Sequence, residues 1–310
     1  MHMLDLIIIG AGAAGLTAAI YAARGGLDFL VLEQDGWGGG QITSANEVEN
    51  YPGTGRIAGG DLGEQFKTQA EELGAKIQMG IVESVRRQED HFEVLLHKGD
   101  SLQAKTVIAA TGAVPRKLGI PGEGELLGRG VSYCAVCDGA FFADQDVAVI
   151  GGGDTAVEDA LFLAGFCRSV TLIHRREGFR APGKRTDALR AEEKITLRLN
   201  QTPEAILGDS LVEGIRVKRG DGTTEDLPVQ AVFVAVGTLP VTDYLAGLPL
   251  SVEEGYVTAG ESGATEVPGL FVAGDIRRKR LRQVVTAAAD GANAATAAMD
   301  YLQGDPAAVR

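Results

Sequence analysis

The sequence has little of several things, and each shortage excludes a class of protein. It has only three cysteines in 310 residues, too few for a disulfide framework. Its 42 acidic residues outnumber its 29 basic ones, and the net charge of −13 argues against nucleic acid or an anionic membrane as the main partner. No apolar run approaches the roughly 18 residues of a membrane span. The sequence enters an apolar strand at residue 4 without a charged leader, so we expect no signal peptide and a cytosolic protein.

Two of the three cysteines stand together in YCAVCDG, where Cys134 and Cys137 have the spacing Cys-x-x-Cys. This spacing fits half of a metal site, a structural disulfide or a working redox pair. A structural zinc site usually needs four ligands, and only Cys167 and four scattered histidines could complete one. We therefore expect no metal. Because cytosolic thiols are kept reduced, a pair that can be oxidised there points to catalysis or sensing rather than to structure.

Glycine, in contrast, is abundant, and it gathers in patterns that are typical of nucleotide binding. Residues 4–9 predict a buried strand, which leads into Gly10-x-Gly12-x-x-Gly15, an alanine-rich helix and a second strand that ends at Glu33. The glycines allow a tight turn and the close approach of a pyrophosphate to a helix N-terminus, whose dipole favours the anion. Glu33 stands where a carboxylate can accept ribose hydroxyls. Strand, glycines, helix and acid in this order predict a dinucleotide site.

The same pattern recurs in DVAVIGGGDTAVEDALFLAG, where Gly151-x-Gly153-x-x-Ala156 follows another apolar strand. A second repeat supports duplication, because VIAATGAVP (107–115) aligns without gaps on VFVAVGTLP (232–240). We therefore expect an α/β fold of two Rossmann-like domains, the second inserted in the first. One domain would consist of residues 1–114 and 242–310, and the other of residues 115–241. The proline that ends each repeated segment would make a semi-rigid hinge.

The two units differ at one matched position. Position 23 after the first glycine of the fingerprint is Glu33 in the first unit and His174 in the second, where Arg175 and Arg176 follow. A carboxylate there suits a free ribose, whereas two guanidiniums suit a 2′-phosphate. The alternative is that these basic residues bind no ligand and lie in solvent at the end of a strand. The offset predicts that the two units accept different dinucleotides.

Seven segments together resemble, in order and over essentially the whole chain, the low-molecular-weight thioredoxin reductases: GAGAAGL, GGGQITSANEVENYPG, ATGA, YCAVCDG, GGGDTAVEDA, HRREGFRA and GDIRRKRLRQVVTAAADGA. The resemblance implies FAD in the first domain, NADPH in the second, a redox-active disulfide between Cys134 and Cys137, and a homodimer that reduces the disulfide of thioredoxin. It makes Cys137 the flavin-proximal thiolate and Cys134 the residue that attacks thioredoxin. Asp138 would be the acid/base, with a helix N-cap as the alternative role.

Carried over by position, the resemblance also implies two sets of cofactor contacts. The FAD contacts are Gly10, Gly12, Ala14, Gly15, Glu33, Gly39, Gly40, Gln41, Asn50, Val82, Ala110, Thr111, Gly112, Gly274, Asp275, Arg282, Gln283 and Val284. Asp275 would hold a ribityl hydroxyl, and a helix from about Arg282 to Leu302 would aim its positive end at the flavin. The NADPH contacts are Gly151, Gly153, Asp154, Thr155, Ala156, His174, Arg175, Arg176, Arg180 and Gly237.

Three features lie outside the common pattern of the family. Ala13 and Val136 stand where many relatives have proline and threonine, and neither removes a group that the chemistry requires. The run RRKRLR (277–282) is unusually basic. Apart from Arg282, we expect it to be solvated or to face the partner of a dimer, with the docking of an acidic thioredoxin as the alternative. Cys167, within LFLAGFC, is expected to be a buried structural residue.

Other functions are disfavoured by particular residues. A relative fed by ferredoxin, or a dithiol oxidase, would not need the pair Arg175 and Arg176. The flavoprotein subunit of alkyl hydroperoxide reductase would carry a thioredoxin-like segment before Leu4, and ferredoxin/flavodoxin-NADP reductases lack Cys-x-x-Cys. A redox-sensing module without catalysis would bind cofactor with negligible turnover on any disulfide.

Overall fold

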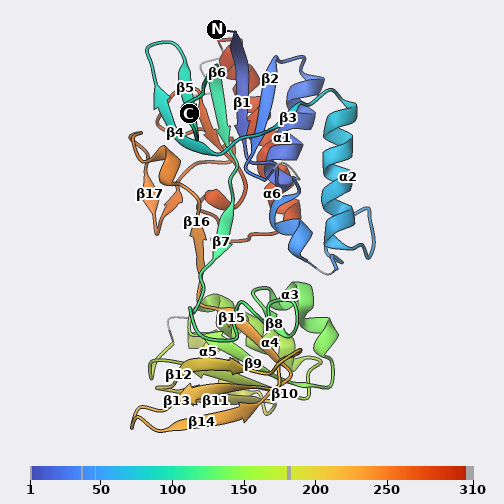
Figure 1. Ribbon diagram of the computed structural model, residues 1–310, viewed down its shortest axis with the longest axis vertical. Helices are drawn as coiled ribbons and strands as arrows, with labels where there is room; N and C mark the ends of the chain where they lie inside the picture. Colours follow the sequence, from blue (N-terminus) through green and yellow to red (C-terminus); the bar gives the residue numbers. More distant parts are fainter. Residues whose placement is uncertain (1, 36–37, 46, 180–182, 305–310) are drawn as a thin grey trace. The chain divides into compact units, whose positions relative to one another are not determined.

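The computed structural model describes residues 2–35, 38–45, 47–179 and 183–304, and the chain divides into two compact units (Figure 1). The chain enters the second unit at Pro115 and leaves it after Thr238. The two crossing segments, β7 (Ala113–Pro115) and β16 (Thr238–Pro240), pair with each other as a two-stranded ribbon. The predicted α/β class and the insertion of one unit within the other are confirmed.

Unit 1 is built on a seven-stranded sheet in the order β3-β2-β1-β6-β5-β4, with β19 paired to the second half of β6. Its parallel strands are β1 (Met3–Ile9), β2 (Phe29–Glu33), β3 (Ile77–Met79), β6 (Ser101–Ala109) and β19 (Leu270–Val272). Two antiparallel strands, β4 (Val82–Arg87) and β5 (Phe92–Leu96), extend one side. Both faces of β1 are buried, as a central parallel strand requires: Leu6 and Ile8 pack into one apolar cluster, and Ile7 and Ile9 into another.

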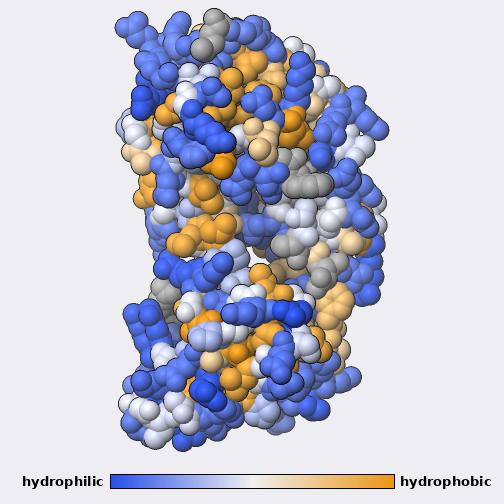
Figure 2. Space-filling view, in the orientation of Figure 1, coloured by the Kyte–Doolittle hydropathy of each residue, from blue (hydrophilic) through white to orange (hydrophobic). Residues whose placement is uncertain are grey.

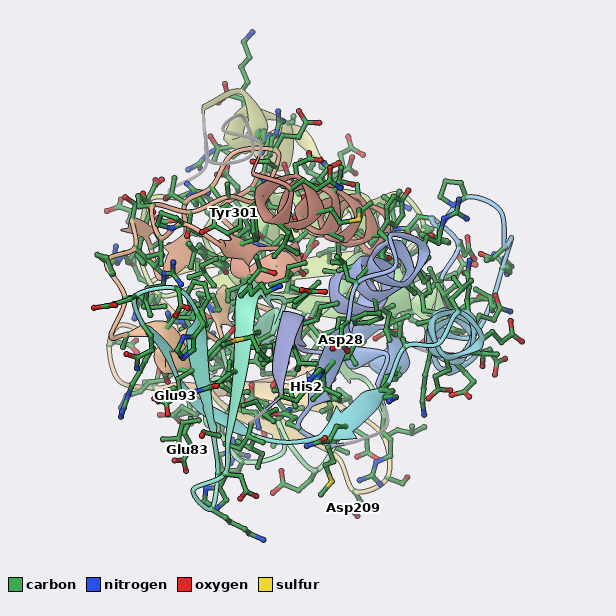
Figure 3. The ribbon with its side chains drawn as sticks, turned by 90° about the horizontal axis from the view of Figure 1, so that it is seen from above. His2, Asp28, Glu83, Glu93, Asp209 and Tyr301 are labelled. Carbon is green, nitrogen blue, oxygen red and sulfur yellow. A yellow bond between two sulfur atoms is a disulfide. The ribbon has the colours of Figure 1, made fainter. Side chains whose placement is uncertain are left out.

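The helices of unit 1 are α1 (Ala13–Arg24), α2 (Gly59–Glu72) and α6 (Val284–Leu302). Figures 1 and 3 show α1 and α6 side by side. Small residues allow this approach, because a Cβ on Gly291 would lie 2.0 Å from the carbonyl oxygen of Ala14. The helix expected from Arg282 begins two residues later. Gln283 is its N-cap, with an extended backbone and a reciprocal capping box with Thr286, so α6 starts after Gln283.

Unit 2 is built on a parallel five-stranded sheet in the order β11-β10-β9-β15-β8. Its strands are β8 (Val131–Ser132), β9 (Asp146–Gly151), β10 (Ser169–His174), β11 (Ile195–Leu199) and β15 (Ala231–Ala235). Val147 and Val149 of β9 pack against α4 (Asp154–Ala164), on the face that also involves α5 (Gly183–Ala191). Ala148 and Ile150 face a three-stranded antiparallel sheet of β12 (Thr202–Leu207), β13 (Gly214–Lys218) and β14 (Thr224–Pro228).

The remaining elements are short: η1 (Gly40–Ser44), α3 (Ala135–Asp138), η2 (Gly139–Phe142), η3 (Asp243–Leu245), β17 (Val252–Glu253), β18 (Tyr256–Val257) and η4 (Gly274–Ile276). The face in Figure 2 is mostly hydrophilic, with apolar residues in separate groups. Within the described part of the chain, no helix has both the length and the apolar character needed to cross a membrane.

Candidate dinucleotide sites and a redox-active cysteine pair

Four parallel strands of unit 1 end at one edge of the sheet and bring several of the predicted FAD residues together. The ends of β1, β2, β6 and β19 are in register, since Ile9 pairs with both Leu32 and Ala109, and Ala109 also pairs with Val272. The residues that follow these ends are the glycine fingerprint, Glu33 itself, the segment 110–112 and Gly274. Ligands of doubly wound sheets bind at this carboxyl edge.

The fingerprint loop can pack against the segment that follows β6 only because Gly10 lacks a side chain. Gly10 has a φ of 102°, and a Cβ there would lie 2.6 Å from the carbonyl oxygen of Ala110. Gly39 approaches from another segment and donates its N–H to the carbonyl of Ala11 at 2.7 Å. The backbone thereby forms a cradle before α1, into which the amide groups of the first helical turn point, as a pyrophosphate requires.

Glu33 is buried at the end of β2 and is held by two backbone donors. Its Oε2 accepts from the N–H of Ala11 at 2.6 Å, and its Oε1 accepts from the N–H of Gln34 at 2.8 Å. These bonds fix the carboxylate beside the fingerprint loop. Each oxygen keeps further acceptor capacity, which suits a ribose hydroxyl.

The polar residues predicted around the flavin are already bonded to one another or to the backbone. The amide of Gln41 donates to the carbonyl of Ala113, and Asn50 Nδ2 donates to Gln283 Oε1 at 3.1 Å. The hydroxyl of Thr111 donates to the carbonyl of Val241 at 2.7 Å. Asn50 and Gln283, far apart in sequence, are thus brought together. The Thr111 hydroxyl joins its loop to the segment that returns from unit 2.

Asp275 and Arg282 fit a polar cofactor at this edge because both carry buried polar atoms with capacity for further hydrogen bonds. Arg282 Nε and Nη2 have no hydrogen-bond partner among the described residues, and Asp275 Oδ1 is contacted by Lys279 Nζ at 3.3 Å. Burial raises the pKa of the Asp275 carboxyl. The guanidinium carbon of Arg282 lies 3.9 Å from the centroid of the Tyr256 ring. Beside a glycine cradle, a flavin dinucleotide can use this remaining capacity through its ribityl hydroxyls and ring carbonyls.

The second fingerprint lies at the corresponding edge of unit 2, where β9, β10 and β15 end. Gly153 is the N-cap of α4, and Asp154 and Thr155 open its first turn with exposed side chains. Gly237 follows β15 with a φ of 105°. Arg175 and Arg176 follow β10 and are exposed, and neither has an ion-pair partner in the part of the chain that the structure describes. Arg180 lies outside the described residues.

His174 occupies the position that corresponds to Glu33, but it makes a different contact. Its ring is buried against the fingerprint loop, so that a Cβ on Gly152 would lie 2.0 Å from its Cε1. It stacks on Phe179 at a centroid distance of 5.5 Å, and Nε2 lies 3.2 Å from the carbonyl of Gly178. His174 therefore supports the loop, whereas the two arginines after it are exposed and can meet a ligand.

Cys134 and Cys137 form a disulfide at the same edge of the unit 2 sheet, directly after β8. Cys134 is the N-cap of α3, and its sulfur accepts a hydrogen bond from the N–H of Cys137 at 3.2 Å. After reduction, this N–H and the helix terminus would favour the thiolate form of Cys134. Gly139 lets the turn pack closely, because a Cβ there would lie 2.8 Å from Leu163 of α4.

Asp138 is held next to the cysteine pair by Ser132, which sequence reasoning missed. The Ser132 hydroxyl is buried, donates to Asp138 Oδ2 at 2.6 Å and accepts from the N–H of Cys134 at 3.0 Å. Asp138 occupies the N-cap position of η2, but its side chain makes no capping hydrogen bond there. This geometry favours the acid/base role over the N-cap alternative.

A buried carboxylate, Glu123, is a second feature that the sequence did not reveal. It is 3% exposed and accepts hydrogen bonds from the N–H groups of Leu118 and Gly119, each at 2.8 Å, and from the Tyr133 hydroxyl at 2.9 Å. Burial and the hydrogen bond to Glu123 raise the pKa of Tyr133. Glu123 thus fixes the residue before Cys134 to the segment that enters unit 2. Only a lone acid between glycines marks it in the sequence.

The expectation that the basic run 277–282 is solvated or faces a dimer partner is wrong for Arg277 and Lys279. Arg277 Nη2 lies 2.6 Å from Asp290 Oδ1, and Lys279 is only 9% exposed between two carboxylates. Arg278 lies near Glu253 at the surface, and Arg280 is exposed. The backbone is extended at Arg277, so the side chains of Arg277 and Arg278 point to opposite sides.

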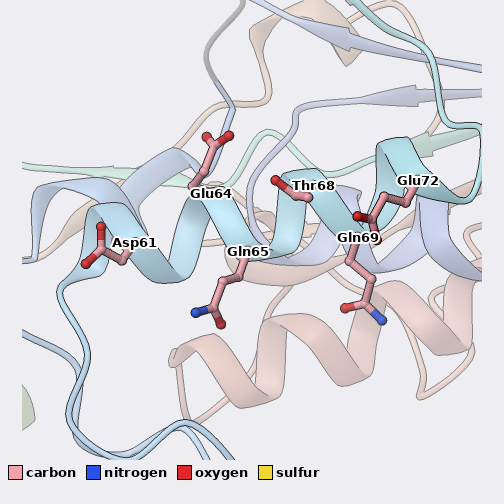
Figure 4. Close-up of a pocket in the computed structure, with 6 residues that line it drawn as sticks. All are labelled: Asp61, Glu64, Gln65, Thr68, Gln69 and Glu72. Atoms are coloured by element: carbon pink, nitrogen blue, oxygen red, sulfur yellow. The ribbon is translucent and has the colours of Figure 1, made fainter.

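Figure 4 shows a surface hollow beside α2, lined by Asp61, Glu64, Gln65, Thr68, Gln69 and Glu72. It is lined by none of the predicted site residues and by no basic side chain that could bind a phosphate group. No group of three or more histidine, cysteine and acidic residues that could hold a metal occurs in residues 2–35, 38–45, 47–179 and 183–304.

Two sheets with a glycine fingerprint each, and a disulfide at the edge of one, define a dinucleotide-dependent disulfide oxidoreductase. Residues 4–291 match the family described as pyridine nucleotide-disulphide oxidoreductase. Thioredoxin reductase of Listeria innocua is 44% identical over 301 residues, which cover 96% of this chain and 94% of that protein. The chain belongs to the pyridine nucleotide-disulphide oxidoreductases and, within them, to the thioredoxin reductases.

Solved structures agree with this assignment. The crystal structure of thioredoxin reductase from Streptococcus pyogenes has a TM-score of 0.88 and 41% identity, covering 97% of this chain and 99% of that one. Thioredoxin reductase from Giardia duodenalis has a TM-score of 0.87 and 34% identity, covering 98% and 100%. The family that the motifs predicted is therefore confirmed.

Proposed function

We propose that this protein is a thioredoxin-disulfide reductase with NADPH as electron donor and FAD as prosthetic group. FAD, when bound, accepts a hydride from NADPH and passes two electrons to a disulfide. The observation that carries the proposal is the Cys134–Cys137 disulfide at the edge of the sheet that also bears the second fingerprint. We assign FAD to residues 1–114 and 242–310, and NADPH and the cysteine pair to residues 115–241.

The cysteines carry out the exchange with thioredoxin in two balanced steps. The Cys134 thiolate attacks one sulfur of the thioredoxin disulfide, and the other thioredoxin sulfur leaves as a thiolate. The Cys137 thiolate then attacks the Cys134 sulfur, which re-forms the Cys134–Cys137 disulfide and releases the second thioredoxin sulfur. Asp138 transfers the proton that accompanies the exchange, because its carboxylate is fixed by Ser132 beside the pair.

Exposed apolar side chains next to the disulfide support a protein as the oxidant. Val136 lies between the cysteines and is 45% exposed, and Phe141, on η2, is 50% exposed. A small-molecule disulfide has no need of such a surface. A folded partner gains apolar burial by packing on it while its disulfide meets Cys134. We also propose, from the resemblance alone, that the protein is a cytoplasmic homodimer.

The experiment that tests the proposed function is a visible spectrum of the purified protein, titrated first with NADPH and then with oxidised thioredoxin. We expect flavin absorbance that NADPH bleaches and that thioredoxin restores, in a ratio of one FAD per chain. The reason is that the cradle beside Gly10, the carboxylate of Glu33 and the buried Arg282 donors without partners in the described residues suit a dinucleotide. A colourless protein that FAD cannot reconstitute would overturn the proposal.

Asp138→Asn tests the proton transfer. The substituted amide keeps an oxygen that can accept from Ser132, so the local fold should persist, but it cannot carry a proton. We expect reoxidation of the reduced enzyme by thioredoxin to slow by about a hundredfold in stopped-flow measurements. FAD content and the bleaching of the flavin by NADPH serve as controls and should not change. An unaltered rate of reoxidation would show that Asp138 does not act as the acid/base.

A further inference from the structure

A buried cluster of four charged side chains lies directly behind the proposed flavin contact Asp275. It consists of Asp275 in η4, Arg277 and Lys279 in the segment after η4, and Asp290 on the second turn of α6. Lys279 and Asp290 have side chains that are only 9% and 7% exposed. Charges so far from water persist only when they are paired and hydrogen-bonded. The function proposed above does not account for this cluster.

Asp290 has several partners that hold it in place. Arg277 donates to it through Nη2 at 2.6 Å and through Nε at 3.3 Å. The N–H of Gly274, at the start of η4, donates to Asp290 Oδ2 at 3.1 Å. The carboxylate therefore ties η4 to α6 even without Lys279.

The position of the Asp275 carboxylate depends on Lys279 far more than the position of Asp290 depends on it. Lys279 Nζ lies 3.0 Å from Asp290 Oδ2 and 3.3 Å from Asp275 Oδ1, so one ammonium group bridges both carboxylates. It is the one cation within ion-pair distance of Asp275 among the described residues. Burial raises the pKa of the Asp275 carboxyl, and the charge of Lys279 opposes that effect.

We propose that Lys279 is a positioning residue of the flavin site: by bridging Asp275 to Asp290, it keeps the Asp275 carboxylate ionised and fixed against α6, ready to accept a flavin hydroxyl. Lys279 itself is enclosed between the carboxylates and acts through Asp275. The inference rests on the proposed function, because it takes FAD as the ligand of Asp275.

The test compares Lys279→Met with Arg280→Met in the full-length protein. Both changes remove one positive charge from the same segment, but Arg280 is exposed and has no ion-pair partner in the described part of the chain. FAD is measured as the fraction released when the holoenzyme is diluted and passed through an ultrafiltration membrane. The midpoint potential of the bound flavin is measured by equilibration with a reference dye.

We expect Lys279→Met to weaken the retention of FAD about tenfold and to shift the flavin potential, because the Asp275 carboxyl is then neither fixed nor kept ionised. Arg280→Met should match the wild type in both measurements. A purely structural role predicts instead that Lys279→Met lowers the thermal midpoint while the folded protein keeps its FAD affinity and potential, and that result would overturn the proposal.

A double-mutant cycle tests whether Lys279 acts through Asp275. In the Asp275→Asn background, Lys279→Met should cause little further loss of FAD, since the carboxylate that it positions is already gone. If the losses of FAD caused by the two changes were additive, Lys279 would not act through Asp275. If Lys279→Met does not accumulate as folded protein, Lys279→Gln, which keeps a donor but no charge, must show the same selective loss of FAD. A wild type that binds no FAD would defeat the proposed function, whereas a wild type that binds it with an unaltered Lys279 variant would defeat this inference alone.

Discussion

Cys134→Ser and Cys137→Ser should each lower the reduction of thioredoxin by more than roughly 1,000-fold, while NADPH still bleaches the flavin. A serine hydroxyl is not ionised near neutral pH and cannot form a disulfide, so either change removes the exchange with thioredoxin. The wild-type disulfide joins these two residues, and the backbone places both at the edge of the unit 2 sheet. Turnover is measured as NADPH oxidation with thioredoxin and an excess of a reporter disulfide.

The two variants should differ in what they trap. Cys137→Ser leaves Cys134 able to attack thioredoxin but removes the thiolate that resolves the mixed disulfide, so a covalent complex should accumulate on a non-reducing gel. Cys134→Ser should trap much less. The opposite pattern would exchange the roles assigned to the two cysteines, and near-normal turnover by either variant would show that the pair is not the relay.

Cys167→Ser is the matched control. Cys167 is fully buried, its Sγ donates to the carbonyl of Phe142 at 3.3 Å, and burial raises the pKa of its thiol to about 11. The thiol is therefore protonated and inaccessible near neutral pH, and a serine hydroxyl can make the same hydrogen bond. Turnover should remain near that of the wild type. The expectation that Cys167 is a buried structural residue is confirmed by its burial.

Local sequence patterns predicted the parts of the fold that hold the dinucleotide sites. Apolar strands followed by glycine fingerprints define β1, α1, β9 and α4 within a few residues, because a buried parallel strand and a tight turn need particular side chains at adjacent positions. The antiparallel strands were not predicted. Strands β4, β12 and β14 are partly exposed, and their alternation of apolar and polar residues is weak.

The contacts that position the site residues could not be read from sequence, because each depends on how the chain folds back. Ser132 contacts Asp138 only because α3 reverses the chain after β8, and Glu123 contacts Tyr133 across a loop. Lys279 and Asp290 belong to different elements, and their meeting depends on where α6 starts. A basic run in a hydrophilic segment is typical of a solvated surface. The sequence does not show that Arg277 and Lys279 of this run point inward. The assignments of individual cofactor contacts stay predictions.

Arg175→Ala/Arg176→Ala should remove most of the preference for NADPH over NADH, and it should do so by weakening the binding of NADPH. Each charge-assisted contact from these arginines to a 2′-phosphate is worth about 1.5–3 kcal/mol, or roughly ten- to a hundredfold in affinity. Both guanidiniums are exposed at the end of β10. The wild type should therefore have a much higher kcat/KM with NADPH than with NADH, and the double variant should lose this difference with NADH use nearly unchanged.

The control for this prediction is a double variant that removes two arginines from unit 2 away from the fingerprint. Arg168 pairs with Asp146 at the start of β9, the end opposite to Gly151, and Arg216 pairs with Asp226 in the antiparallel sheet. Arg168→Ala/Arg216→Ala lowers the net charge by the same amount, so it accounts for long-range attraction between the protein and the dinucleotide. If both double variants weakened the binding of NADPH equally, the effect would be caused by the change in net charge. Equal use of NADPH and NADH by the wild type would refute the argument from position 23, because the two arginines would then have no phosphate to recognise.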